Sequence, residues 1–347
     1  MKKIVHTLSL LFLIISSCSH ADLSIAPPSE NLRNIGDFLK NNYDYNLFYE
    51  SLNYVGLIEK LNSEGSFTVF VVPNSAFHKK GILTKNDVLK LNKDSLLKAL
   101  NNYILPMKLQ SKDLPTNGVD VRYKTLSGNE ISMASNINEG DKDITSWYVQ
   151  GYFISYVRKN INLINGTIHE LEYPFNFFPD LSIKDFLSNR PQYNNFVLGL
   201  KKFGIWDKLD NNSLYTIFAP TNEALKKIGI TKDWLDKTDL NLYNGNRLFG
   251  TYILFNKQLF LSDFNYLSGR YKYLIKDDDH TVEVHAPTPF NGIYDVELWV
   301  TKPNKHLPIA TSINNQASLS KNNRCSNGII HQIDNGLVAP KDSQISN

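Results

Sequence analysis

The chain has 347 residues, and its 37 basic and 34 acidic side chains leave a formal net charge of +3. These charges are spread along the sequence without a block of five or six like charges, which argues against a nucleic-acid-binding surface. The length is enough for about two domains of ordinary size, each with its own hydrophobic core.

The N-terminus has the pattern of a secretion signal. Lys2 and Lys3 precede an apolar run from Leu8 to Ile15, and two serines then precede Cys18. The run is too short to cross a bilayer core, which needs roughly 20 apolar residues. Residues 15–18 (Ile-Ser-Ser-Cys) resemble a lipobox, which implies that Cys18 is acylated and becomes the mature N-terminus. The alternative is a plain secretory peptide in which Cys18 has no role.

If residues 15–18 are a lipobox, the N-terminal region consists of a signal peptide at residues 1–17 and a tether at residues 18–33. Two or three acyl chains would hold the protein at a membrane, because each buried CH₂ contributes about 0.8 kcal/mol. Ser19 follows the cysteine in place of an acidic residue, which favours the outer membrane over the inner one. Cys325 is then left without an intrachain partner, and we interpret it as a small buried apolar residue.

An internal repeat follows the tether. A shift of 148 residues aligns Asp37–Ile82 with Asp185–Ile230 without a gap, and 18 of these 46 pairs are identical. A repeat of this length predicts two copies of one folded unit. We place copy one at residues 34–176 and copy two at residues 181–341, with a tail at residues 342–347.

The predicted elements of copy one begin with an amphipathic helix that contains Phe48 and Val55 and ends at Gly56. A strand from Phe67 to Val72 follows, because this run is apolar and β-branched. Asn74 comes just after it, and we expect its side chain to cap the next helix. A further helix is expected from Asp94 to Ile104.

Copy two repeats the order of helix, strand and asparagine, with the strand Tyr215–Ala219 and a capping role for Asn222. We expect a helix from Tyr243 to Leu254. Alternating residues then predict three strands, Tyr271–Lys276, Thr281–His285 and Val296–Thr301. Each copy closes with an Asn-Gly pair that leads into a strand, at 165–171 and 327–333, which indicates a hairpin. The predicted fold class is α+β.

Two segments of copy two resemble the signature boxes of the fasciclin (FAS1) domain family. They are Thr216–Leu225 (TIFAPTNEAL) and Asn327–Asp334 (NGIIHQID), which is followed by Pro340. Copy one departs from the first box, since Val72 stands where proline is usual and Pro73 comes one residue later. Copy one otherwise fits at Phe70, Asn74, Ala76, Phe77, Asn165, Gly166 and His169, so that the resemblance spans roughly residues 34–175 and 181–341.

The resemblance implies a wedge of β-strands with helices packed around it in each copy. It also implies extracellular adhesion and recognition of proteins or glycans, without enzymatic chemistry. Many members carry a Tyr-His pair used in core hydrogen bonding and integrin recognition, but here the pairs are Tyr103-Ile104 and Tyr252-Ile253. The missing histidines argue against integrin-type binding through this motif, while the two tyrosines are expected to keep a packing role.

The sequence holds only partial matches to catalytic and metal-binding motifs. His169 and Glu170 start like a zinc-protease helix, but Tyr173 stands where the second histidine is needed. Because His169 and His331 occupy the same position in both copies, we interpret both as structural. The signatures of serine hydrolases, phosphate-binding loops and thiol redox enzymes do not occur in the sequence. We therefore assign no catalytic residue, no metal ligand and no cofactor.

One acidic cluster, Asp277-Asp278-Asp279-His280, has two readings. Its oxygen ligands suit a hard cation, but the flanking strands favour a solvated hairpin turn.

The leading functional hypothesis is a membrane-anchored surface lipoprotein that binds a protein or glycan, for adhesion or as an accessory to nutrient capture. The expected partners are therefore a protein or glycan at the cell surface and a membrane through the lipid, with no nucleic acid. The alternative is a structural component that packs against partner lipoproteins or fibres, and an enzyme is the third hypothesis.

Overall fold

The computed structural model describes residues 33–116, 118–137, 144–155, 157–171, 181–210, 212–267, 271–274, 281–285, 297–302, 305–311 and 323–345. Residues 34–347 cluster as one compact unit. The predicted signal peptide, Cys18, nearly all of the tether and the 277–280 cluster lie outside the described residues.

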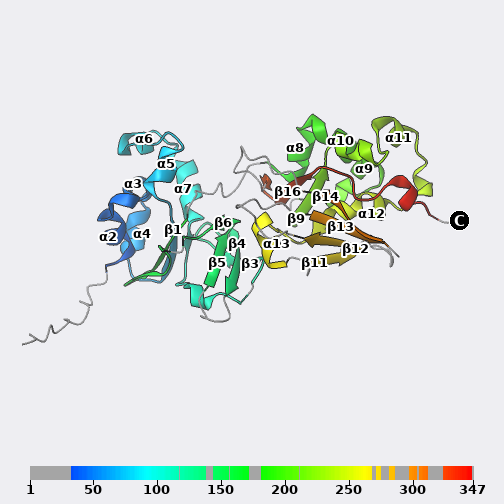
Figure 1. Ribbon diagram of the computed structural model, residues 1–347. Coiled ribbons are helices and arrows are strands. Elements are labelled where there is room, and N and C mark those ends of the chain that lie inside the picture. The colour runs from blue at the N-terminus through cyan, green and yellow to red at the C-terminus, as the bar shows by residue number, and fades with distance from the viewer. Residues whose placement is uncertain are drawn as a thin grey trace, which may run out of the picture. The chain divides into compact units, whose positions relative to one another are not determined.

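Copy one alternates short helices with two small groups of strands (Figure 1). Its helices are α2 (Ile35–Lys40), η2 (Tyr43–Tyr45), α3 (Asn46–Tyr54), α4 (Leu57–Asn62), α5 (Asn74–His78), α6 (Lys85–Leu89), α7 (Lys93–Asn101) and η3 (Ser111–Asp113). Its strands are β1 (Phe67–Val71), β2 (Ile104–Leu105), β3 (Val121–Lys124), β4 (Glu130–Ile137), β5 (Ile144–Val149), β6 (Tyr152–Phe153), β7 (Ile161–Leu163) and β8 (Gly166–Glu170).

The strands of copy one form two four-stranded sheets, with the orders β2-β1-β8-β7 and β3-β4-β5-β6. The first sheet joins the beginning of the copy to its end, because β1 and β8 are parallel neighbours with Phe67 opposite Gly166. The second sheet is an antiparallel meander. Figure 1 shows α2, α3 and α4 gathered beside β1, and α2 contacts both α4 and β8.

Copy two has the same plan. Its helices are α8 (Ile183–Ser188), η4 (Pro191–Tyr193), α9 (Asn194–Lys202), η5 (Trp206–Lys208), α10 (Asn222–Lys227), α11 (Lys232–Lys237), η6 (Leu240–Leu242), α12 (Gly245–Leu248), η7 (Gly250–Tyr252), α13 (Leu261–Leu267) and η8 (Pro340–Asp342). Its strands are β9 (Tyr215–Pro220), β10 (Ile253–Phe255), β11 (Tyr271–Leu274), β12 (Thr281–His285), β13 (Glu297–Lys302), β14 (Lys305–Thr311), β15 (Asn323–Cys325) and β16 (Gly328–Ile333).

The sheets of copy two have the orders β10-β9-β16-β15 and β11-β12-β13-β14. Strands β9 and β16 are parallel, with Tyr215 opposite Gly328, which matches the pairing of β1 with β8 in copy one. Both closing hairpins expected from the Asn-Gly pairs are present, as β7-β8 and β15-β16. The α+β fold class expected from the sequence is confirmed.

The predicted helix from Tyr243 to Leu254 is wrong. Two short helices, α12 (Gly245–Leu248) and η7 (Gly250–Tyr252), stand in place of one continuous helix, and Ile253 already lies in strand β10, opposite Ile217 of β9. Glycine costs about 1 kcal/mol relative to alanine inside a helix, which weakens a long helix through this segment, and Gly245 at the start of α12 permits close packing. A Cβ atom added there would lie 2.5 Å from the Phe203 ring.

Two separate hydrophobic cores support the two copies. One core draws its buried residues from Ile35 to Leu171, and the other draws its buried residues from Ile183 to Val338. In copy one the buried Trp147 of the second sheet meets Phe70 of the first sheet edge-on, with ring centroids 6.1 Å apart. Such aromatic contacts fasten the two sheets to each other.

No helix within the described residues is long and apolar enough to span a bilayer.

Candidate functional site

A set of hydrogen bonds on the two central strands of copy one holds the segment after β2 in place. The Thr68 hydroxyl donates to the Met107 carbonyl at 2.7 Å and accepts from the Leu109 N–H at 2.8 Å. The imidazole Nε2 of His169 lies 2.9 Å from the Leu109 carbonyl oxygen. Thr68 and His169 are both fully buried, and the two bonds to Leu109 are made away from water.

Copy two repeats this arrangement, which we call the Thr-His clasp. The Thr216 hydroxyl donates to the Lys257 carbonyl and accepts from the Leu259 N–H, each at 2.9 Å. His331 Nε2 lies 2.9 Å from the Leu259 carbonyl oxygen. The position shared by His169 and His331 therefore joins the last strand of each copy to the segment after its second strand.

The protonation of His169 follows from its partners. Its Nδ1 accepts a 3.0 Å hydrogen bond from the Asn160 N–H, so the proton of the neutral ring is on Nε2 and is donated to Leu109. Burial lowers the pKa of His169 to about 4. A buried neutral histidine with both nitrogens in use serves the fold rather than proton transfer.

The asparagine of each closing turn anchors the first helix of its copy. Asn165 accepts a 3.0 Å hydrogen bond from the Ile35 N–H and donates to the Leu61 carbonyl at 2.7 Å. Asn327 accepts from the Ile183 N–H at 2.8 Å and donates to the Asp210 carbonyl at 2.7 Å. The turn that leads into the last strand therefore also fixes where each copy begins.

The prediction that Asn74 caps the helix that follows it is wrong. Asn74 is the first residue of α5, and its side chain makes no capping bond to that helix. Its Oδ1 instead accepts from the Leu47 N–H at 3.1 Å, at the start of α3, and its amide donates to the Tyr43 carbonyl at 2.7 Å. A local pattern cannot show this, because the helix that is capped lies 27 residues earlier in the chain.

Asn222 behaves in the same way. Its Oδ1 accepts from the Asn195 N–H at 3.0 Å, at the start of α9, and its amide donates to the Pro191 carbonyl at 2.9 Å. The N-cap of α10 is Thr221, whose hydroxyl accepts from the Ala224 N–H. The two asparagines therefore tie the end of the central strand to the preceding amphipathic helix.

Both tyrosines of the predicted packing pair are buried. Tyr103 lies edge-on to Phe48, with ring centroids 6.0 Å apart, and Tyr252 lies edge-on to Phe196 at 5.4 Å. The Tyr252 hydroxyl also accepts a 2.8 Å hydrogen bond from the Leu337 N–H. In copy two this tyrosine therefore fastens the segment that follows the last strand.

The thiol of Cys325 is buried, and burial raises its pKa to about 12. Such a thiol is a poor nucleophile because only the thiolate reacts. Across the described part of the chain, no three His, Cys, Asp or Glu residues are grouped so that they could hold a metal ion.

The two copies meet at a tight turn. Gln150 and Gly151 form the turn between β5 and β6, and both have positive φ, at 53° and 73°. The Gln150 carbonyl accepts a hydrogen bond from the guanidinium of Arg324 in copy two. A Cβ atom on Gly151 would lie 2.7 Å from the Phe260 ring, so glycine permits this approach of copy one to copy two.

Arg324 lies among aromatic rings of both copies. Its Cζ atom is 4.2 Å from the ring centroid of Tyr152 in copy one and 5.1 Å from that of Phe260 in copy two. Asp263 is buried near this contact on α13, which touches β4 of copy one. Burial raises the pKa of Asp263 to about 8, and its Oδ2 accepts from the Phe260 N–H at 2.8 Å.

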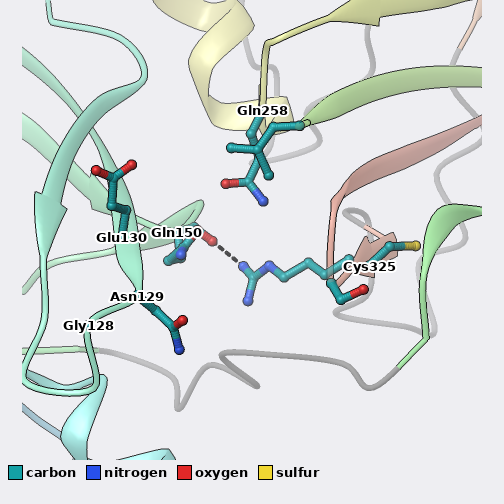
Figure 2. Close-up of a pocket in the computed structure, with 9 residues that line it drawn as sticks. Gly128, Asn129, Glu130, Gln150, Gln258 and Cys325 are labelled. Carbon is teal, nitrogen blue, oxygen red and sulfur yellow. Dashed lines mark hydrogen bonds between the residues drawn. The ribbon is translucent and has the colours of Figure 1, made fainter. Parts of the chain in front are cut away.

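A cavity of about 320 Å³ opens beside this contact, and both copies line it. Figure 2 shows the Arg324–Gln150 bond as a dashed line, with the carboxamides of Asn129 and Gln258 on either side of it. Glu130 also lines the cavity, but its carboxylate points away from that bond. We take this cavity as the candidate functional site.

None of the residues predicted as site residues from the sequence lines this cavity. The residues that form it come from turns and strand ends far apart in the chain. In the sequence, the cavity is indicated only by a difference between the two copies. In the register that aligns His169 with His331, Asn162 of copy one corresponds to Arg324, so the arginine is specific to copy two.

The chain is similar to proteins of one known family. The family model described as the fasciclin domain matches residues 43–175 and 191–339. Periostin from Homo sapiens is 24% identical over 172 residues, which are 50% of this chain and 19% of periostin. The chain therefore spans about a fifth of the length of this curated relative. The FAS1 domain pair of the insect cell adhesion molecule fasciclin I is 17% identical, with a TM-score of 0.35, over 86% of this chain and 98% of that one.

Proposed function

Because the chain belongs to the fasciclin domain family and carries the domain twice, we propose that it is a surface lipoprotein that binds protein or glycan ligands. The observation that carries this proposal is the match of the fasciclin domain to both copies, since these domains are known for cell adhesion and ligand binding. In this proposal the chain is not an enzyme. The buried histidines support that view, because their Nε2 atoms are bonded to backbone carbonyls inside the fold.

The proposed location is the outer membrane, with a lipid on Cys18 as the anchor. The sequence supports the anchor through the basic residues, the apolar run and the Ser-Ser-Cys that follows it. The tether at residues 18–33 would let the two domains reach a ligand away from the lipid surface. Ligand capture by the domains would serve adhesion or nutrient uptake.

The anchor is tested by metabolic labelling with radioactive palmitate and by membrane fractionation. We expect Cys18→Ala to abolish the label and to release the protein from membranes. Cys325→Ala is the matched control, since the Cys325 thiol is buried within copy two, and it should keep both the label and the membrane location. A labelled Cys18→Ala protein would refute the anchor.

Ligand binding is tested with the purified full-length chain in mild detergent, on arrays of glycans and of cell-surface proteins. We expect saturable binding to at least one member of these classes. Turnover of an array compound, together with no saturable binding, would overturn the binding proposal.

A further inference from the structure

The cavity between the copies has the chemistry of a ligand site. Six of its nine lining residues carry nitrogen or oxygen in their side chains. Its volume of about 320 Å³ lies at the small end of the range for ligand pockets, about 300–1,000 Å³. The size suits one small polar unit better than a peptide segment or a helix.

Arg324 is the cationic residue of the cavity lining. Its guanidinium is held by the Tyr152 ring at 4.2 Å and by the bond to the Gln150 carbonyl. A guanidinium presents five N–H donors in a planar fork, and that fork matches the two oxygens of a carboxylate. Because the aromatic rings and the carbonyl already fix the position of the group, a ligand loses little free energy in ordering it.

The other polar residues suit hydroxyl groups. Asn129 and Gln258 offer carboxamides, which both donate and accept, and Ser326 offers a hydroxyl. The Glu130 carboxylate only accepts, and Figure 2 shows it turned away from the arginine end. One end of the cavity therefore favours a negative charge, and its walls favour neutral groups that donate and accept hydrogen bonds.

From this arrangement we propose that the cavity binds a uronic-acid unit of an acidic glycan. The sugar carboxylate would pair with Arg324, and the ring hydroxyls would bond to Asn129, Gln258 and Glu130. The site needs both copies, since Asn129 and Glu130 come from copy one while Gln258 and Arg324 come from copy two. This inference rests on the proposed binding function and names a ligand class for it.

The comparison of the copies supports a role beyond folding for the arginine. Asn162 takes the corresponding place in copy one, on β7 opposite Thr167, as Arg324 does on β15 opposite Ile329. The closing hairpin therefore forms with either residue. The arginine appears in the copy where this position faces the cavity.

The test is titration calorimetry of the full-length chain with sodium D-glucuronate at constant ionic strength. We expect saturable binding, with D-glucose and acetate each at least tenfold weaker because each lacks one of the two recognised features. Arg324→Gln should weaken glucuronate binding at least tenfold. Arg190→Gln is the matched control, because Arg190 lies over the Phe186 ring at 3.6 Å outside the cavity, and it should leave the affinity unchanged.

A second variant covers the case in which Arg324→Gln disturbs the fold. Asn129→Ala with Gln258→Ala removes two polar side chains that line the cavity and should weaken glucuronate binding while acetate binding is unchanged. Glucuronate that fails to bind the wild type, or binds both variants normally, would overturn the inference. Equal binding of sulfate, acetate or the free carboxylate of N-acetyl-diglycine would also overturn it.

Failure of this inference can be told apart from failure of the proposed function. If the full chain binds another member of the glycan or protein arrays but not glucuronate, only the assignment of the cavity is wrong. If neither the arrays nor glucuronate give saturable binding, the proposed function is wrong as well.

Discussion

The Tyr45 hydroxyl donates a 2.7 Å hydrogen bond to the Glu170 carboxylate, whereas the corresponding Tyr193 of copy two bonds to the neutral Gln332 at 2.8 Å. The two copies thus share a bond between a buried tyrosine and the last strand. They differ in whether its acceptor is charged. In copy one the charge is matched by Arg158, which lies 2.9 Å from Glu170.

This difference predicts unequal effects of two substitutions at Glu170. Glu170→Gln keeps an acceptor for Tyr45, and Arg158 is 42% exposed and can be hydrated, so we expect a cost of about 1 kcal/mol or less. Glu170→Ala leaves the buried Tyr45 hydroxyl without that acceptor and should cost a further 1–3 kcal/mol or so. Urea unfolding followed by circular dichroism measures both, and equal costs would contradict the prediction.

The lowered pKa of His169 predicts a pH-dependent stability. The folded pKa of about 4 lies below the unfolded value of about 6.5, so the unfolded chain binds the extra proton first as the pH falls. The contribution of neutral His169 is therefore complete above about pH 6.5 and is lost as the pH falls toward 4. Between pH 7.5 and pH 5 the loss is about 2 kcal/mol.

The measurement is urea unfolding of the wild type and His169→Gln at both pH values. Glutamine does not titrate, so the stability advantage of the wild type should shrink by about that amount at pH 5. The comparison with the variant removes the effect of every other titrating group. An advantage that stays constant with pH would show that His169 does not carry this dependence.

The contact between the copies predicts a difference between two glycines. Gly151 and Gly128 both lie in strand-connecting turns with positive φ, at 73° and 86°. Alanine at either should cost about 1 kcal/mol through the backbone alone. At Gly151 the new Cβ would also meet the Phe260 ring at 2.7 Å, whereas at Gly128 nothing lies within 4 Å.

We therefore expect Gly151→Ala to cost at least about 1 kcal/mol more than Gly128→Ala in thermal or urea unfolding. Adding Phe260→Ala should remove most of that excess, because it removes the ring that the new methyl meets. If the two single variants are equally stable, copy one does not approach copy two at this turn.

The side chain of Asn222 predicts a graded series. Asn222→Ala removes the acceptor for the Asn195 N–H and the donor to the Pro191 carbonyl, so we expect a loss of about 1–2 kcal/mol. Asn222→Asp keeps the acceptor at the start of α9 and adds a favourable charge there, so it should cost less. Thr221→Ala, which removes the local cap of α10, is the matched comparison for a cap within one helix. Urea unfolding measures the loss of stability in each variant. If Asn222→Asp loses as much stability as Asn222→Ala, the Asn222 side chain does not cap α9.

The sequence was sufficient for the local features of this fold. Apolar β-branched runs predicted β1 and β9, and the two Asn-Gly pairs predicted the closing hairpins. The repeat and the two signature boxes predicted the family, which the match of the fasciclin domain over both copies confirms.

Features that depend on distant residues could not be read in this way. The periodicity around Tyr243 to Leu254 resembles one helix, but pairing of Ile253 with Ile217 takes its last two residues into a sheet. The partner of Asn74 is set by how α3 lies against β1, not by its neighbours in the chain. The cavity depends on how turns of two copies meet, and no local pattern marks Arg324 as part of it.

The parallel pairing of β1 with β8 and of β9 with β16 also constrains how the protein is made. Phe67 pairs with Gly166 and Tyr215 pairs with Gly328, so each central sheet closes only after almost the whole copy has been synthesised. Closing such long loops is slow, because the entropy of loop closure is lost before the strands pair. Until then β1 has an open edge on which another chain could pair, and the arrival of the last strand removes that hazard from each copy in turn.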